Sequence, residues 1–241
     1  MKIFDTLIIG SCYRALGYAL TRPDTVIVEE RELCDTQLCL PIYSFEEEKH
    51  EPVTELGGSL KKHFEVLSLY QDGMQNTTAL EMGFCGFAKE REAEILLKCR
   101  VVSTESSDGC YDVKTVSGAG IKHFFAKRVI DMRAVGENFS LTMLFEAESA
   151  EALSEFAKSI PDSRIEPAFY AGRYAIHAPI PTGEDRLAAA ERLYKAFLEC
   201  DTKARLLHVA YTVLKDGSDV DFGGPIGALE EGVRLASEVR K

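Results

Sequence analysis

The stretch DTLIIGSCYRALGYALTRPDTVIVEE, residues 5–30, decides what fold this 241-residue chain predicts. Thr6 to Ile9 form a short apolar run, typical of a strand that is buried on both faces of a parallel sheet. Gly10 follows this strand, and a helix is predicted from about Tyr13 to Thr21. The order of a strand, a glycine turn and a helix is the first half of a strand–helix–strand unit.

The second half of the unit follows directly. Arg22-Pro23-Asp24 ends the predicted helix, and the β-branched run Thr25 to Val28 predicts a second strand that finishes in Glu29 and Glu30. In such a unit the N–H groups at the start of the helix bind pyrophosphate at the positive end of the helix dipole. A carboxylate at the position of Glu29 accepts hydrogen bonds from a ribose 2′-hydroxyl, which favours FAD or NAD.

The glycine pattern of a dinucleotide site, GxGxxG, is only partly present. Its three glycine positions are occupied by Gly10, Cys12 and Ala15. Alanine at the third position still permits close packing of helix against strand. We expect the side chain of Cys12 to weaken cofactor binding, because backbone normally approaches the phosphates at that point.

The middle of the chain predicts a return to the same sheet. Residues 31–78 have a weak pattern that predicts loops and short helices with a turn at Gly57-Gly58, and a helix is predicted around Thr78 to Glu90. Turn signals then separate β-rich runs, which predicts an antiparallel meander that rejoins the sheet through Arg128 to Asp131.

The pattern changes after Gly136. Residues 137–204 predict a β-α-β-β-α segment that forms its own small α+β cap lobe for a substrate. We expect the sheet of this lobe to face the cofactor. Residues 1–136 and 205–241 would form the nucleotide-binding scaffold, with one more strand from Leu206 to Leu214 near the main sheet and a final helix. The predicted fold class is therefore α/β, a Rossmann-like domain with an antiparallel meander and a small cap lobe.

Three segments together resemble the FAD-dependent oxidoreductases of the two-dinucleotide-binding-motif type. They are DTLIIGSCYRALGYA at the start, AKRVIDMRA at residues 126–134 and GGPIGALEEGVRLA at residues 223–236. The resemblance covers about half of the chain and implies a Rossmann-like FAD/NAD(P)-binding fold with FAD as the cofactor. It also implies the cofactor-binding positions, which are Gly10, Ser11, Cys12, Tyr13, Arg14 and Ala15 at the pyrophosphate, Glu29 and Glu30 at the adenosine ribose, Val101 at the adenine edge, Arg133 at the opposite wall, and Gly224, Pro225 and Ile226 at the ribityl chain or the flavin ring.

One departure from the family pattern concerns the second wall of the site. Where the family has Ala-Thr-Gly after this strand, the chain has Met132-Arg133-Ala134. Arg133 replaces a small residue, but Arg133 or Arg14 could offset the loss by pairing with phosphate, since a guanidinium binds phosphate in a bidentate way.

The composition of the chain limits the classes of partner that it is expected to bind. The net charge is −11 and no basic run or face is evident, so the sequence does not predict binding to nucleic acid or an anionic membrane. Neither an apolar run of membrane-spanning length nor a signal peptide is recognisable, which predicts a cytoplasmic protein with small-molecule or protein partners. Seven scattered cysteines suit reduced thiols, and the five histidines have no metal-binding spacing.

Two further patterns carry weaker functional predictions. Cys34 and Cys39 are five positions apart after the second strand, where glutathione-reductase-like flavoproteins have a redox disulfide, or they are two ordinary loop thiols. His177, in a predicted strand of the cap lobe, is either a catalytic residue or a hydrogen-bonded core residue. Arg173 and Tyr174 on that strand could hold an anionic substrate or form a solvated face.

Two hypotheses for function remain. In the first, the protein positions FAD, which exchanges hydride between its N5 atom and a small-molecule substrate. In the second, the chain keeps the scaffold, binds FAD weakly or not at all, and serves as a subunit or binding module for a protein partner or in a homo-oligomer. The sequence identifies no catalytic base.

Overall fold

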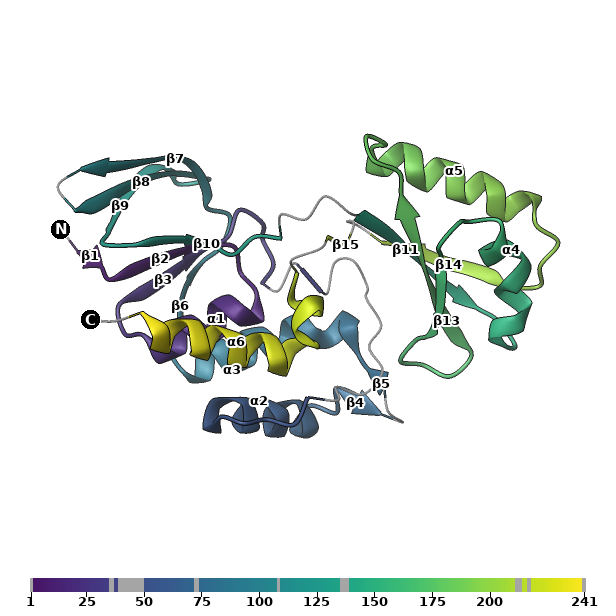
Figure 1. Cartoon of the computed structure of the whole chain (residues 1–241), viewed down its shortest axis with the longest axis horizontal. Helices are drawn as coiled ribbons and strands as arrows, with labels where there is room; N and C mark the ends of the chain where they lie inside the picture. The colour runs from purple at the N-terminus through teal and green to yellow at the C-terminus, as the bar shows by residue number, and fades with distance from the viewer. Residues whose placement is uncertain are drawn as a thin grey trace.

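The computed structural model shows two lobes side by side (Figure 1). The structure describes residues 2–34, 37–38, 50–71, 74–107, 109–134, 139–210, 214–215 and 218–239. The first lobe holds the N-terminal half and the last helix of the chain, and the second lobe holds residues 139–209 together with residues 214–215.

The first lobe is built on a four-stranded parallel sheet. Its order is β10-β2-β3-β6, formed by β10 (Val129–Asp131), β2 (Thr6–Ile9), β3 (Thr25–Val28) and β6 (Glu94–Leu96). The predicted placement of the strands ending at Ile9, Glu29 and Asp131 in one parallel sheet is confirmed. Leu7 belongs to the core on one face of this sheet and Ile8 to the core on the other, so β2 is buried on both sides as its apolar run predicts.

The antiparallel meander covers one face of the parallel sheet. Its strands are β7 (Arg100–Ser107), β8 (Cys110–Ser117) and β9 (Gly120–Ala126), and β1 (Ile3–Phe4) adds to β9 in parallel. Val113 and Ala126 of the meander pack with Leu7, Val26 and Val28 of the sheet, which confirms the predicted meander and fixes its side.

Helices cover the other face. They are α1 (Tyr13–Thr21), α2 (Glu55–Val66), α3 (Leu80–Glu90) and α6 (Pro225–Glu238), accompanied by the short helices η1 (Thr77–Ala79) and η3 (Asp219–Phe222) and the hairpin of β4 (Tyr70–Gln71) and β5 (Met74–Gln75). Ile8 and Ile27 of the sheet pack with Ala15 and Tyr18 of α1 and Ala236 of α6.

Helix α2 corrects a sequence-based expectation. Gly57-Gly58 was expected to form a turn, but both glycines lie inside α2. A Cβ atom added at Gly57 would lie 2.3 Å from Oε1 of Glu230, so Gly57 is needed where the two helices meet rather than where the chain turns.

Helices α1 and α6 approach backbone to backbone. A Cβ atom at Gly17 would lie 1.9 Å from the carbonyl oxygen of Leu229, and one at Gly232 would lie 2.0 Å from that of Arg14. Only glycine permits such an approach at these two positions.

The second lobe has a separate antiparallel sheet of order β12-β13-β11-β14. It consists of β12 (Arg164–Pro167), β13 (Arg173–Ile180), β11 (Phe139–Glu146), β14 (Arg205–Val209) and β15 (Leu214–Lys215), which also pairs with β11. Helices α4 (Ser154–Lys158) and α5 (Arg186–Glu199), with η2 (Ala150–Leu153), pack on one face through a shared core that includes Phe145, Phe156 and Leu193.

The strand expected near the main sheet from Leu206 to Leu214 is placed differently. Residues 205–209 form β14, which pairs antiparallel with β11 in the second lobe. Leu206 and Val209 pack on the core of that lobe, and their burial there explains the pairing.

Candidate functional site

The turn after β2 has the geometry expected of a phosphate-binding loop. Gly10 has φ +98°, a conformation that strongly favours glycine, and its N–H donates to the carbonyl of Val28 at 2.9 Å. Helix α1 then begins, with Cys12 as its N-cap residue. We call residues Gly10 to Ala15 the phosphate loop.

The chain's own side chains accept hydrogen bonds from the phosphate loop. Ser11 N donates to Oε2 of Glu29 at 2.8 Å, Tyr13 N to Oδ2 of Asp219 at 2.6 Å, and Ala15 N to Sγ of Cys12 at 3.4 Å. These are the donors that would otherwise be available to an anion at the start of a helix.

A glutamine links the surroundings of the loop. Nε2 of Gln37 donates to the carbonyl of Met132 at 2.8 Å, while its Oε1 accepts from the backbone N–H of Asp219 at 3.1 Å. We call this the Gln37 bridge. Gln37 and Asp219 are buried, so the bridge is an internal part of the site and not a surface contact.

Asp219 has no exposed surface, and its environment changes its acidity. Burial raises the pKa of Asp219 to about 6, although the N–H of Tyr13 and the positive charge of Arg14 act to lower it. The carboxylate thus sits at the positive end of α1 in place of an external anion, but it is held there at an electrostatic cost.

Cys12 turns its side chain into the core at the start of α1. Its side chain is fully buried in the core with Ile8 and Met132, where Sγ lies 3.8 Å from the carbonyl of Met132 and caps Ala15. The thiol is therefore packed into the scaffold, and the expected weakening of cofactor binding by Cys12 stays a prediction.

Two arginines lie at the loop, Arg14 within it and Arg133 beside Gly10. Oδ2 of Asp131 accepts a hydrogen bond from Arg133 at 2.5 Å, and the Cγ atom of Arg133 would be 2.8 Å from a Cβ atom at Gly10. Burial would raise the pKa of Asp131, but the hydrogen bonds and charge of Arg133 lower it overall. Arg14 stacks over Phe222, donates to the carbonyl of Met132, and keeps a buried Nε without a hydrogen-bond partner in the described part of the chain.

Three further predicted positions, Glu29, Glu30 and Val101, lie outside the phosphate loop. Glu29 is buried at the end of β3, and its Oε1 accepts from Arg31 N at 2.9 Å, whereas Glu30 is exposed. Val101 is half-buried in the core between the sheet and the meander. The structure therefore brings Glu29 to the loop directly, and Val101 only to the layer beside it.

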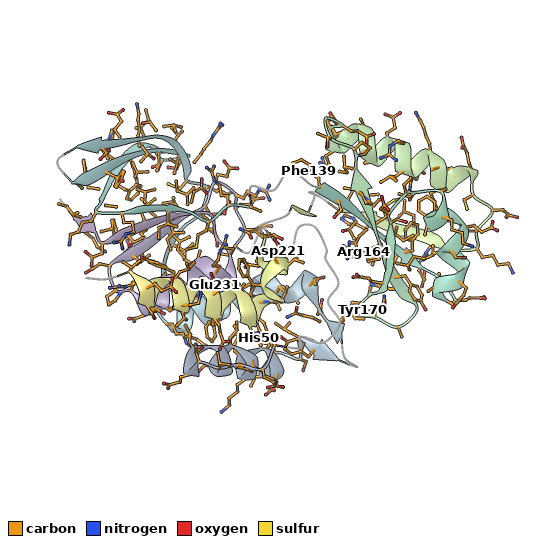
Figure 2. All side chains as sticks on the ribbon, viewed as in Figure 1. His50, Phe139, Arg164, Tyr170, Asp221 and Glu231 are labelled. Carbon is orange, nitrogen blue, oxygen red and sulfur yellow. The ribbon has the colours of Figure 1, made fainter. Side chains whose placement is uncertain are left out.

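The start of α6 completes this region. Gly224 has φ +103°, Pro225 is the first residue of α6, and Ile226 is buried in the core that also contains Tyr13. Figure 2 shows Asp221 of η3 on the side of the first lobe that faces Arg164 of the second lobe. Asp219 of η3 and Gln37 are the two residues that sequence reasoning missed, and the acidic segment DVDF before Gly223-Gly224 is the signal that could have revealed the first.

The residues fit the two halves of FAD unequally. The adenosine side has the expected carboxylate, Glu29, at the end of β3. The pyrophosphate side already has its donors at Ser11, Tyr13 and Asp219 bonded within the chain, next to the carboxylates of Glu29 and Asp219. As folded, these donors are not free for an added phosphate, so a phosphate would have to displace the chain's own acceptors.

Other predicted candidates are placed as follows. Nδ1 of His177 is 2.9 Å from Oγ1 of Thr142, and Nε2 is 3.3 Å from Oε2 of Glu166, so its ring is held within the second sheet. Arg173 stacks over Tyr170, and Tyr174 packs on the core under α4 and α5, so the two do not share a face. The pair Cys34 and Cys39 is not tested, because Cys39 lies outside the described residues.

The described residues contain neither a metal-binding cluster nor a membrane-spanning helix. No group of three or more His, Cys, Asp or Glu side chains there could hold a metal ion. No helix in the same residues is long and apolar enough to cross a membrane.

Comparison with known proteins supports the fold. Neither a family model nor a curated protein matches the sequence. Solved structures do match. A geranylgeranyl bacteriochlorophyll reductase-like protein from Thermoplasma acidophilum has a TM-score of 0.60 at 11% identity, over 98% of this chain and 78% of that one. The p-nitrophenol 4-monooxygenase of Pseudomonas putida DLL-E4 has a TM-score of 0.58 at 10% identity, with 98% and 78% covered.

A third structure was solved with the cofactor itself. Aklavinone-11 hydroxylase, in a ternary complex with FAD and aklavinone, has a TM-score of 0.52 at 14% identity, covering 98% of this chain and 62% of that one. At such identities the likeness establishes the fold alone. The chain has the Rossmann-like FAD/NAD(P)-binding fold of flavoproteins.

Proposed function

We propose that this chain is an oxidoreductase-type flavoprotein scaffold with a weak intrinsic affinity for FAD. The single observation that carries the proposal is that Asp219 accepts the hydrogen bond of Tyr13 N at the start of α1, where a pyrophosphate would need it. The scaffold and the position of Glu29 support FAD as the ligand class. The occupied donors support weak binding.

FAD has to displace internal groups in order to bind. The Gln37 bridge must open to free the N–H of Asp219, and the Asp219 carboxylate must leave Tyr13 or become neutral. Arg14, with its unpartnered Nε, and the hydroxyl of Ser11, which is also buried without a partner among the described residues, are then the groups that would hold the phosphates. When bound, FAD would supply hydride transfer between its N5 atom and a small-molecule substrate.

The same observation favours a second candidate. A scaffold whose phosphate loop is satisfied internally keeps its fold without a cofactor, as a subunit or binding module for a protein partner would. The two candidates differ in one property, which is whether FAD binds at all at cellular concentrations.

The test begins with the visible spectrum of the purified protein and a titration with FAD followed by flavin fluorescence. We expect a colourless protein whose FAD affinity increases as the pH falls from 8 to 5.5, because Asp219 then becomes neutral. Asp219→Asn should remove this pH dependence and bind FAD more tightly than wild type at pH 7.5.

Two results would contradict the proposal. One is a yellow protein that retains one FAD per chain through purification. The other is weaker FAD binding by Asp219→Asn than by wild type, which would make Asp219 a ligand of the cofactor rather than its competitor. A colourless protein with no measurable FAD binding at any of these pH values would favour the binding-module candidate.

A further inference from the structure

An apolar stripe runs along the solvent-facing side of α5 in the second lobe. The exposed fractions of Leu187, Tyr194 and Leu198 are 66%, 46% and 63%. Because an α-helix has about 3.6 residues per turn, these three side chains lie within about 40° of one another around the helix axis. Ala189 and Leu193 of the same helix are buried in the core of the lobe. Helix α5 therefore has a second apolar face, which we call the α5 stripe.

The α5 stripe has the form of a surface that receives another helix. With a rise of about 1.5 Å per residue, it extends for about 16 Å from Leu187 to Leu198. Single exposed apolar residues are common, whereas large ones aligned on one helix face are typical of a contact with another helix. Figure 1 shows α5 on the outer surface of the second lobe, where another molecule can reach it.

Opposite charges lie on one flank of the stripe. Glu191 and Lys195 are about 40° and about 80° from Leu187, in the same sense around the axis. Their side chains are 67% and 66% exposed, and Nζ of Lys195 is 2.7 Å from Oε1 of Glu191. The other flank has Ala190, whose small side chain is partly buried. One flank is thus able to form ion pairs with a partner, and the other has room for a large side chain.

A second copy of α5, laid antiparallel on the first, complements this pattern. When Leu187 of one copy is level with Leu198 of the other, a two-fold axis relates the helices and the charged flank of each faces that of the other. Glu191 is then level with Lys195 of the second copy to within about 1.5 Å, and the symmetry repeats this pair. Tyr194 is level, to the same precision, with Ala190 of the second copy. Apolar groups therefore meet along the stripe, and each acid meets a base.

We propose that the α5 stripe binds a second copy of this chain, in a two-fold symmetric dimer whose α5 helices are antiparallel. Contact between Leu187 and Leu198 supplies the attraction, and the pairs of Glu191 with Lys195 fix the register. Only one helix of each chain takes part, which is little beside the surface of about 1,200 Å² or more that stable interfaces bury, so we expect a dissociation constant on the order of 10–100 µM. The dimer goes beyond the proposed function and does not depend on FAD.

The first experiment measures the association of the full-length protein by sedimentation equilibrium, from about 5 to about 200 µM and with a thiol reductant present. Wild type should change from monomer to dimer over this range. Leu198→Asp should weaken the dimer at least about tenfold, or roughly 1.4 kcal/mol. The matched control is Met82→Asp, on α3 of the first lobe, where the side chain is 65% exposed; it should leave the dissociation constant unchanged.

Two results of this experiment would overturn the proposal. A wild-type protein that stays a monomer at every concentration would assign the α5 stripe to a different protein. A dimer that Leu198→Asp leaves intact would place the contact elsewhere on the molecule.

The second experiment tests the antiparallel register through the charges. Lys195→Glu and Glu191→Lys each place like charges opposite one another, so each variant alone should associate at least about threefold more weakly than wild type. An equimolar mixture of the two restores opposite charges at every contact and should associate as tightly as wild type. Added salt at about 0.5 M should reduce these differences but not the effect of Leu198→Asp. A mixture that associates no better than the separate variants would overturn the register, and circular dichroism checks that both variants are folded.

Discussion

The first turns of α1 and α2 are both closed by a carboxylate from the C-terminal segment, yet the two carboxylates are in opposite electrostatic states. At α2, Oε1 of Glu230 accepts from Val53 N, Thr54 N and the Thr54 hydroxyl, and Oε2 pairs with His50 at 2.5 Å. Figure 2 shows His50 beside α2 and α6. At α1, Asp219 accepts from Tyr13 N, and among the described residues it forms no ion pair comparable to that of Glu230 with His50.

The difference appears in their acidity. Burial would raise the pKa of Glu230, but His50 and the three donors around Thr54 lower it overall. Burial raises the pKa of Asp219 to about 6, and the contacts with Tyr13, Arg14 and Cys12 do not compensate. A carboxylate therefore caps α2 favourably and α1 unfavourably. For this reason we expect FAD binding to displace the carboxylate at α1 and not the one at α2.

The largest expected effect on stability is at Glu230. Glu230→Ala leaves three donors and His50 without their acceptor and should lower the free energy of unfolding by about 3 kcal/mol, measured by urea denaturation at pH 7. Glu231→Ala, one residue along and on the exposed side of α6 with Arg234, is the matched control and should cost less than about 0.5 kcal/mol. Equal losses of unfolding free energy in the two variants would show that the buried contacts of Glu230 do not stabilise the fold.

Asp219 should produce the opposite pH dependence. Its pKa is higher in the folded state than the ordinary value of 3.8, so its contribution to stability is present at acidic pH and is lost as the pH rises through about 6. Relative to Asp219→Asn, wild type should lose about 2 kcal/mol of unfolding free energy between pH 4.5 and 7.5. A stability difference that stays constant over this range would show that the carboxyl is not strained.

Removing the Gln37 bridge should increase the affinity for FAD. Gln37→Ala frees the N–H of Asp219, and we expect FAD to bind about tenfold more tightly, or roughly 1.4 kcal/mol. Gln75→Ala, which removes another buried glutamine, in the hairpin after α2, is the control and should leave the FAD affinity unchanged. An unchanged FAD affinity of the Gln37→Ala protein would show that the Gln37 bridge does not cause the weak FAD binding.

The smallest effect is expected at Cys12. Because its thiol is buried and caps α1, Cys12→Gly should cost about 1 kcal/mol of stability and bring no gain in FAD affinity. Cys12→Ser keeps a capping group and should restore part of the stability in thermal unfolding. Tighter FAD binding by Cys12→Gly than by wild type would show that the Cys12 side chain obstructs the phosphates.

The sequence predicts the local parts of this site and misses its long-range parts. The apolar runs, the glycine turn and the acidic residue at Glu29 follow from neighbouring residues, so β2, α1, β3 and the loop are where they were expected. Asp219 reaches Tyr13 across 206 positions, and Gln37 reaches Met132 across 95. No periodicity or spacing reports such contacts.

Two incorrect expectations have the same origin. Gly57-Gly58 has the composition of a turn, but the packing of Glu230 against Gly57 places both glycines inside a helix. Residues 205–209 have an ordinary strand pattern, and only the partner available in space, β11, decides which sheet they join. In both cases tertiary packing overrides the local signal.

The backbone contact between α1 and α6 also sets the order of events during synthesis. Gly17 and Gly232 lie where each helix presses on the main chain of the other, and Arg22 donates to the carbonyl of Ala236 at 2.9 Å. Helix α1 leaves the ribosome early, but the surface it must bury emerges more than two hundred residues later. Until then the second lobe can assemble from its own contiguous strands, whereas the nascent first lobe has to wait with an apolar helix face uncovered, a period in which chaperones would have their main opportunity to bind.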